Sequence, residues 1–184
     1  MKVTRLAIGD VCLLEPKVFG DPRGFFLSTW NDEQFRRDVA DVTFVQDNTS
    51  RSRQWTLRGL HVQAQHTQGK LVRCAVGRVW DVAVDIRASS PSFGQWVGAE
   101  LSDENQHQLW IPPGFAHGFV VLSESADLQY KVTDRYHPAS EQTLQWNDPA
   151  VNIAWPIPAG IDLLLSPKDA DGTLLTDFEA GPHR

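Results

Sequence analysis

The most informative stretch of the sequence is residues 71–86, which are mostly apolar and rich in valine and are divided into two halves by Gly77-Arg78. A glycine-containing dipeptide between two such runs is typical of a tight hairpin, so we expect the two halves of the run to pair as antiparallel strands. Residues 79–86 put an apolar row on one face and Asp81 and Asp85 on the other. Because alternate residues of a strand face opposite sides, the acids indicate either a solvent-facing side or a polar cavity.

Short β-prone segments punctuated by glycine and proline recur along the rest of the chain. We predict strands at residues 25–30 and 42–45, and a solvated loop at the polar residues 46–51. Only residues 31–40 have the pattern of a helix, because Asn31 can cap it and apolar side chains follow at helical spacing. Together these patterns predict an all-β sandwich or jelly-roll barrel.

Length and composition limit the class of protein. The chain shows no internal repeat, linker or second domain, so residues 1–184 are predicted to form a single domain. A net charge of -6 argues against nucleic-acid binding, although a local arginine cluster can still bind a small anion. Cys12 and Cys74 match no metal or redox spacing and are predicted to be buried thiols in a reducing compartment. No apolar leader or membrane-length apolar run is present, which predicts a soluble, cytoplasmic protein that binds no membrane.

The residues best suited to chemistry begin at Arg58-Gly59-Leu60-His61, which Lys70 follows nine residues later. If His61 and Lys70 lie on neighbouring strands with their side chains on the same face, they line one cavity. There a histidine, which takes up and releases protons near neutral pH, can act as a base. The alternative for His61 is a hydrogen-bonded group of the core or surface. His117 is expected at a turn-to-strand junction facing a pocket mouth, and Tyr130 at a core edge with its hydroxyl in water.

Further motifs extend over nearly the whole chain. In order, they are Glu15-Pro16-Lys17-Val18-Phe19-Gly20-Asp21, Arg23-Gly24-Phe25-Phe26, Phe44-Val45-Gln46-Asp47-Asn48, Leu57-Arg58-Gly59-Leu60-His61, Gln68-Gly69-Lys70-Leu71-Val72-Arg73, Asp81-Val82-Ala83-Val84-Asp85-Ile86-Arg87, Phe93-Gly94-Gln95-Trp96, Trp110-Ile111-Pro112, Gly114-Phe115-Ala116-His117-Gly118-Phe119, Tyr130-Lys131, Trp146-Asn147-Asp148 and Lys168-Asp169. The ordered set resembles the dTDP-4-dehydrorhamnose 3,5-epimerase family. No single motif decides this, but the set as a whole is specific.

The resemblance implies an all-β, cupin-type jelly roll with one or two short surface helices, and an isomerase that needs no cofactor. The implied reaction converts dTDP-4-keto-6-deoxy-D-glucose to dTDP-4-keto-L-rhamnose by epimerisation at C3 and C5, a step in L-rhamnose and polysaccharide biosynthesis. The implied partners are this nucleotide-linked sugar and a second copy of the chain in a homodimer.

The resemblance also implies individual roles. Both reacting carbons lie next to a ketone, so the reaction needs a base, an acid on the opposite face and a group that holds the enolate oxygen. His61 matches the family base, Asp169 the carboxylate that orients it, and Tyr130 the acid. Lys70, helped by His117, matches the group beside the carbonyl oxygen.

Nucleotide and diphosphate contacts are implied for Arg23, Gln46, Asn48 and Arg58. A guanidinium fork suits phosphate oxygens, which fits the arginines to this role. N-terminal strands cross to the partner in the family, so Phe25 and Phe26 are expected to line the neighbouring subunit's nucleotide site.

The sequence departs from the family at several positions. Ser28 stands where most members use a glutamate near the base, which leaves the thymine preference open. Gln129 replaces an apolar neighbour of Tyr130, which leaves open whether one carbon or both react. Two alternatives therefore stay: a monofunctional 3- or 5-epimerase on a related nucleotide-linked 4-keto sugar, and a sugar-nucleotide-binding jelly roll without turnover. The retained base and acid argue against the second, because a binder needs neither.

Metal binding is not expected. Metal-binding cupins usually place two histidines two residues apart and a glutamate shortly after them. Here His61 and His66 are five residues apart, no acid follows nearby, and Lys70 would repel a dication.

Overall fold

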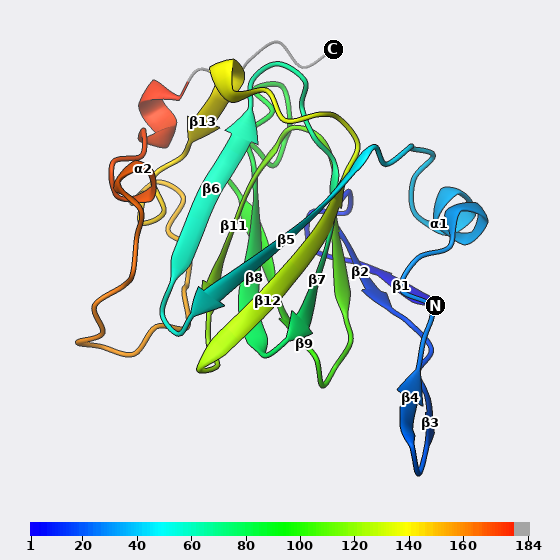
Figure 1. Ribbon diagram of the computed structural model, residues 1–184. Helices are drawn as coiled ribbons and strands as arrows, with labels where there is room; N and C mark the ends of the chain where they lie inside the picture. Colours follow the sequence, from blue (N-terminus) through cyan, green and yellow to red (C-terminus); the bar gives the residue numbers. More distant parts are fainter. Residues whose placement is uncertain (179–184) are drawn as a thin grey trace.

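Two antiparallel sheets face each other in the computed structural model, which describes residues 1–178 (Figure 1). The six-stranded sheet has the order β1 (Lys2–Arg5), β2 (Cys12–Glu15), β10 (Gln108–Ile111), β7 (Lys70–Val76), β12 (Ser125–Val132) and β5 (Gln46–Arg53). The five-stranded sheet has the order β13 (Glu141–Thr143), β6 (Leu57–Gln63), β11 (Phe115–Val121), β8 (Arg78–Asp85) and β9 (Trp96–Ser102). This is the predicted all-β jelly-roll architecture.

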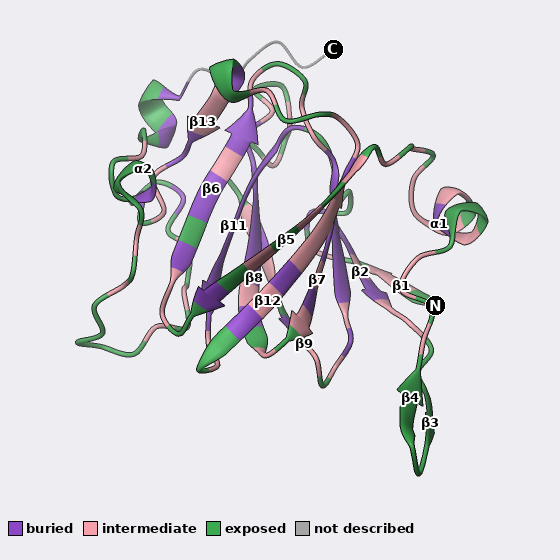
Figure 2. Cartoon of the chain, in the orientation of Figure 1, coloured by how far each residue is buried: buried purple, intermediate pink, exposed green. Residues whose placement is uncertain are grey.

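Short elements lie outside the two sheets. They are the hairpin of β3 (Phe19–Asp21) and β4 (Gly24–Phe26), the helices α1 (Asp32–Asp38) and α2 (Pro167–Ala170), and the 3-10 turns Pro138–Ser140 and Leu175–Asp177. The β3–β4 hairpin projects away from the sandwich and is exposed along its length (Figure 2). Helices in the described part of the chain are all too short or too polar to cross a membrane.

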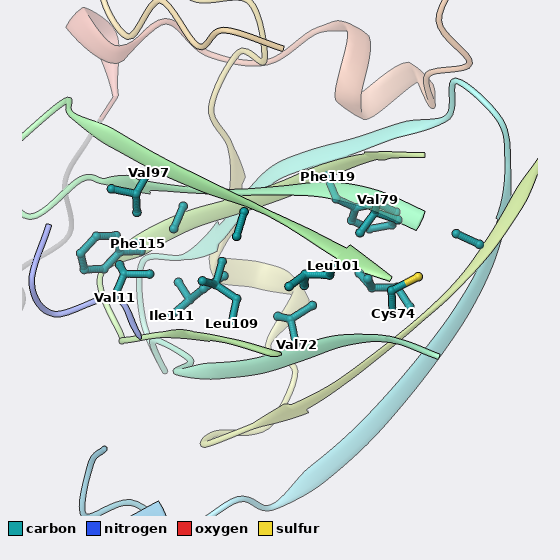
Figure 3. Packing of buried hydrophobic residues seen from close by; sticks show 14 of the residues in the cluster. Val11, Val72, Cys74, Val79, Val97, Leu101, Leu109, Ile111, Phe115 and Phe119 are labelled. Carbon is teal, nitrogen blue, oxygen red and sulfur yellow. The ribbon is translucent and has the colours of Figure 1, made fainter. Parts of the chain in front are cut away.

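The main core fills the space between the sheets (Figure 3). Val72 and Leu109 enter it from the six-stranded sheet, and Val79 and Phe115 from the five-stranded sheet. Burial of such apolar surface is the main force that holds the layers together. Both cysteines are buried free thiols, as predicted.

The predicted hairpin at Gly77-Arg78 is wrong. The strands themselves form, as β7 and β8, but they belong to opposite sheets and share no ladder. Gly77 has φ 77°, and a Cβ atom there would lie 2.1 Å from the carbonyl oxygen of Ser125. This glycine therefore turns the chain from one sheet to the other. The acidic face of β8 consequently points into the molecule, where Asp81 and Asp85 are fully buried.

The predictions for residues 42–45 and 46–51 are also wrong. Residues 42–45 form no strand, whereas the polar residues that follow form β5, which pairs with β12 over its full length. Alternate residues of β5 are exposed, and those between them are at least partly covered. A strand whose inner side faces a polar cavity has no need of apolar residues, so its composition resembles that of a loop.

The N-terminal helix agrees with its sequence pattern, whereas the strand expected before it does not. Asn31 caps α1 by accepting a hydrogen bond of 2.8 Å from the backbone N–H of Gln34. Phe35 is buried in a second cluster beneath the helix, with its ring 5.3 Å from that of Trp110. Of the predicted strand 25–30, only its first two residues belong to β4.

Candidate active site

A cavity of about 200 Å³ opens between the two sheets. Its wall contains cationic, imidazole and phenol groups together with a few apolar side chains. The lining residues are Ser50, Arg58, His61, Val62, Gln63, Gln68, Lys70, Phe115, His117, Gly118, Phe119, Tyr130, Tyr136 and Glu141. A concave site with converging titratable groups is the usual form of an active site.

His61 lies on β6 with its imidazole against a buried carboxylate. Its Nε2 is 2.6 Å from Oδ1 of Asp169, which α2 supplies. Burial raises the pKa of Asp169, but hydrogen bonds from His61, the Ser166 hydroxyl and the Gly59 N–H outweigh burial and lower this pKa to about 2. The carboxylate is therefore ionised at neutral pH. A carboxylate in this position can fix the orientation of the ring and can stabilise an imidazolium at His61.

Lys70 enters the same cavity from β7, in the opposite sheet. His61 and Lys70 do line one cavity, but they face each other across the sandwich rather than sharing neighbouring strands. Burial lowers the pKa of Lys70 from 10.5 to about 8, while Asp81 and Glu141 oppose this shift. The ammonium form therefore predominates at pH 7 and places a positive charge in a poorly hydrated site.

His117 lies on β11 directly beside His61 in the sheet register. It is buried, and its Nε2 lies 2.9 and 3.0 Å from the two carboxylate oxygens of Asp81. Burial lowers the pKa of His117, and the Asp81 carboxylate partly offsets this effect. Asp81 does not itself line the cavity, but its contact with His117 places this acid of β8 behind the cavity wall rather than on a solvent-facing side.

Tyr130 and Arg58 complete the cavity from the two sheets. Tyr130 lies on β12, and burial raises the pKa of its phenol, so this group keeps its proton at neutral pH. Arg58 lies on β6 and donates from Nε to the hydroxyl of Ser52 at 2.9 Å. Its side chain remains otherwise exposed at the cavity, where it can bind an anion.

The strands that carry the two histidines touch at a pair of glycines. A Cβ atom on Gly59 would lie 2.5 Å from Cα of Gly118, and one on Gly118 would lie 2.6 Å from the carbonyl oxygen of Arg58. Gly59 also has φ 120°, which side chains rarely tolerate. Close approach of β6 and β11 therefore sets the spacing of the two imidazoles.

Comparison with known proteins agrees with this geometry. A model of the dTDP-4-dehydrorhamnose 3,5-epimerase family matches residues 5–177. The chain belongs to this family. It is 55% identical over 183 residues to the dTDP-4-dehydrorhamnose 3,5-epimerase of Pseudomonas aeruginosa, covering 99% of this chain and 100% of that one. It is 56% identical over 184 residues to the Neisseria gonorrhoeae enzyme of the same name, covering all of this chain but only 56% of that relative's length.

A solved structure has the same fold. The dTDP-6-deoxy-D-glucose-3,5-epimerase of Legionella pneumophila, in complex with dTDP-4-keto-L-rhamnose, superposes with a TM-score of 0.94 at 50% identity. The match covers 97% of this chain and 95% of that one. Membership of the epimerase family makes the chain an isomerase.

Not all residues that the family resemblance selects lie in the cavity. Gln46 and Asn48 lie on β5, hydrogen-bonded to each other at 2.7 Å, and Asn48 is opposite Tyr130 in the register. Arg23 lies in the β3–β4 turn, paired with Asp21. Phe26 and Ser28 line a separate hollow beside α1. Within one subunit of this epimerase, therefore, the N-terminal residues lie apart from the imidazoles.

The sequence interpretation missed three parts of the epimerase site. Asp81 was recognised as a buried or exposed acid but not as the partner of His117. Glu141 and Tyr136 line the cavity, with the Tyr136 hydroxyl donating to Glu141 at 2.9 Å. They lie in a stretch without strong local pattern, so only the pairing of β13 with β6 reveals them. Within residues 1–178, no three His, Cys, Asp or Glu side chains are grouped to hold a metal ion.

Proposed function

We propose that this chain epimerises dTDP-4-keto-6-deoxy-D-glucose at C3 and C5 to give dTDP-4-keto-L-rhamnose, with His61 as the base and Tyr130 as the acid. One observation carries the assignment of roles: His61 and Tyr130 reach the cavity from opposite sheets. A sugar ring between them has a proton acceptor on one face and a proton donor on the other. That is the arrangement that inversion of a carbon centre requires.

The chemistry proceeds through an enolate. His61 removes the proton from a carbon next to the ketone, and the bond electrons move onto the carbonyl oxygen. The Lys70 ammonium stabilises that oxygen, and a buried cation does so more strongly than one in water. Tyr130 then donates its proton to the opposite face of the carbon. Exchange with solvent returns the proton lost by Tyr130 and removes the one held by His61, so a second carbon can react.

The nucleotide end of the substrate binds toward Arg58, whose free guanidinium edge suits diphosphate oxygens. Gln46 and Asn48 on the neighbouring strand β5 extend this polar wall. Anion binding at the mouth explains how a chain of net charge -6 accepts an anionic substrate.

The functional unit is a homodimer. Phe25 and Phe26 are 59% and 70% exposed on a hairpin that projects from the sandwich, and Arg23 lies at its turn. Exposed aromatic rings on such a projection are typical of an interface. In the dimer, this hairpin supplies the partner's nucleotide site with the contacts that it cannot make within its own subunit. The two buried thiols fit a cytoplasmic location.

The test is incubation with dTDP-4-keto-6-deoxyglucose in deuterium oxide, with deuterium counted at each carbon. The proposed function requires label at both C3 and C5 together with formation of the L-rhamno product. Label at a single carbon would identify a monofunctional epimerase, and no label would identify a binding protein without turnover. Gln129, whose side chain lines a different hollow from that of His61, gives no structural reason for single-carbon specificity.

A further inference from the structure

The carboxylate of Asp169 can hold the imidazole of His61 in only one orientation. Its Oδ1 lies 2.6 Å from Nε2 of His61 and also accepts from the Gly59 N–H at 3.2 Å. The last side-chain torsion of an aspartate is broad and roughly two-fold, so rotamer preference alone does not fix the plane of the carboxylate. Hydrogen bonds must therefore keep Oδ1 against the ring.

Ser166 supplies the hydrogen bond to the other carboxylate oxygen. Its hydroxyl donates to Oδ2 of Asp169 at 2.7 Å, and within residues 1–178 it is the only protein group that donates to this oxygen. The same hydroxyl oxygen accepts from the Asp169 N–H at 3.2 Å, which leaves the hydroxyl hydrogen directed at the carboxylate. Hydrogen bonds from a hydroxyl to an ionised carboxylate are among the stronger ones in proteins. One hydroxyl thus caps α2 and orients its carboxylate.

The strand that carries His61 also determines where Ser166 lies. The carbonyl oxygen of Leu164 accepts from the Leu57 N–H at 3.1 Å, and Leu57 is the first residue of β6. Asp169 contacts the same strand at His61. The segment 164–169 therefore runs beside β6 and is attached to it at both ends. Ser166 lies between the two attachments, so its hydroxyl has a fixed place relative to the imidazole.

We propose that Ser166 is a positioning residue, whose hydroxyl orients the Asp169 carboxylate so that Oδ1 stays in contact with His61. This inference rests on the proposed function, in which His61 is the base. Ser166 does not line the cavity, and it acts only through Asp169. Without the hydroxyl, the carboxylate can turn about its last torsion and release the ring. A displacement of about 1 Å in a catalytic group can cost up to about a hundredfold in rate.

The test compares Ser166→Val with Ser166→Thr. Residue 166 is exposed, so the extra methyl group of either variant has room. Valine and threonine have nearly the same shape, and only threonine keeps the hydroxyl. Ser166→Val also fills the space that a replacing water would need. We expect kcat to fall about tenfold in Ser166→Val, with epimer formation and solvent exchange falling together, and to stay close to wild type in Ser166→Thr. Wild-type kcat in Ser166→Val, or an equal loss in Ser166→Thr, would overturn the proposal.

A third variant separates orientation of the carboxylate from capping of α2. Ser166→Asp keeps a good N-cap acceptor, but an ionised aspartate cannot donate to Asp169. We expect kcat to be low in this variant, and wild-type kcat would show that capping alone matters, which overturns the proposal. The matched control is Ser102→Ala. The buried Ser102 hydroxyl accepts from the Asn105 N–H at 3.0 Å over the same three-residue spacing, but away from the cavity. This control should keep the wild-type kcat.

A double-mutant cycle tests whether Ser166 acts through Asp169. Ser166→Val is combined with Asp169→Ala, and kcat is compared with that of Asp169→Ala alone. A residue that acts only through Asp169 should cause no further loss once the carboxylate is gone. The same fold loss in both backgrounds would overturn the proposal. Thermal melting checks that each variant is folded.

A spectroscopic readout gives a check that needs no turnover. The short His61–Asp169 hydrogen bond should give a strongly downfield imidazole proton in the NMR spectrum of the wild-type protein. That signal should weaken or move upfield in Ser166→Val and persist in Ser166→Thr and Ser102→Ala. An unchanged signal in Ser166→Val would overturn the positioning role alone. Absence of deuterium exchange into substrate with the wild-type protein would instead overturn the proposed function.

Discussion

Lys70 Nζ lies 3.3 Å from the backbone carbonyl oxygen of His61, so the buried ammonium donates to the strand that carries the imidazole. This contact crosses from one sheet to the other. In the proposed mechanism, this contact holds the ammonium that stabilises the enolate at a fixed place relative to His61, the base that forms the enolate. The proposed mechanism therefore requires the rate of the reaction to depend on the protonation of Lys70.

The pH dependence follows from that group. Burial lowers the pKa of Lys70 to about 8, so the ammonium is lost as pH rises through this value. We expect kcat/KM to fall on the alkaline side with a midpoint near 8. Lys70→Arg, whose guanidinium stays charged above pH 12, should have a lower rate but no fall near 8. Rate profiles from pH 6 to 10 make the comparison, and an unchanged alkaline limb in Lys70→Arg would contradict the assignment.

Hydrogen exchange between substrate and solvent distinguishes the role of His61 as the base from that of Tyr130 as the acid. His61→Ala should lower epimerisation and solvent exchange together by about 10²- to 10⁴-fold, because the first step is lost. Tyr130→Phe should lose inversion but keep exchange, since an enolate formed at His61 can be reprotonated from the same face. Deuterium incorporation is measured beside epimer formation in both variants. Normal inversion in Tyr130→Phe would show that another group donates the proton.

The contribution of Asp85 to the free energy of unfolding should disappear at acidic pH. Burial raises the pKa of Asp85, but hydrogen bonds from Arg87, Ser90 and Ser92 outweigh burial and lower it from 3.8 to about 2. A lowered pKa in the folded state stabilises the protein above pH 4, and this stabilisation is lost as pH falls from about 4 to about 2. It amounts to about 2 kcal/mol at neutral pH.

Asp85→Asn should therefore lower the free energy of unfolding at pH 7 by about 2 kcal/mol, and the difference from wild type should shrink toward pH 2. Urea unfolding at pH 7 and pH 2.5 measures it. Asp10→Asn is the control, because Asp10 pairs with the same Arg87 but is exposed. It should cost less than about 1 kcal/mol. Equal losses at both pH values would exclude the proposed linkage.

Formation of the homodimer can be tested by the molar mass in solution and by substitution of Phe26. Light scattering should give twice 20.6 kDa at micromolar concentration. Phe26→Ser should raise KM about tenfold, since stacking of an aromatic ring on a base contributes about 1–3 kcal/mol. Its effect on Tm should be small because the ring is 70% exposed. A monomer in solution would rule out the shared site.

Turnover should not require a metal ion. The spacing of the histidines near His61 does not suit a metal site, and the ammonium of Lys70 disfavours a dication in the cavity. Exhaustive dialysis against EDTA should leave kcat and KM unchanged. Activity that disappeared on chelation and returned with one divalent ion would overturn this expectation.

Local patterns in the sequence identify most strands but not their pairing. The division of residues 71–86 into two strands is correct. The strands that pair with β7 and β8 lie far along the chain, however, and Gly77 connects the two sheets instead of forming a hairpin turn. Strand β5 was missed because its inner side faces a polar cavity, so no apolar alternation marks it. An apolar pattern in the sequence reveals strands that are buried against apolar neighbours. It does not reveal a strand such as β5, whose inner side faces a polar binding site.

The candidate site was predicted to a similar extent. Single motifs indicated His61 and Lys70, but the family resemblance was needed to associate Asp169 with the imidazole. The Asp81–His117 contact and the Lys168–Glu141 ion pair depend on register between distant strands, which one sequence does not encode in any local pattern. Arg23, Phe26 and Ser28 are outside the cavity, and their predicted role depends on a second subunit.

The distance along the chain between His61 and its carboxylate has a consequence for folding. The two residues are separated by 108 positions, and α2 is one turn that follows the last strand of the sandwich. Such non-local contacts form late, because the chain must lose the conformational entropy of closing a long loop before the contact can contribute favourable energy. A refolding chain can complete both sheets before residue 169 docks. Recovery of enzymatic turnover should therefore lag behind recovery of β-sheet circular dichroism, and the assembled dyad acts as a marker of the fully native molecule.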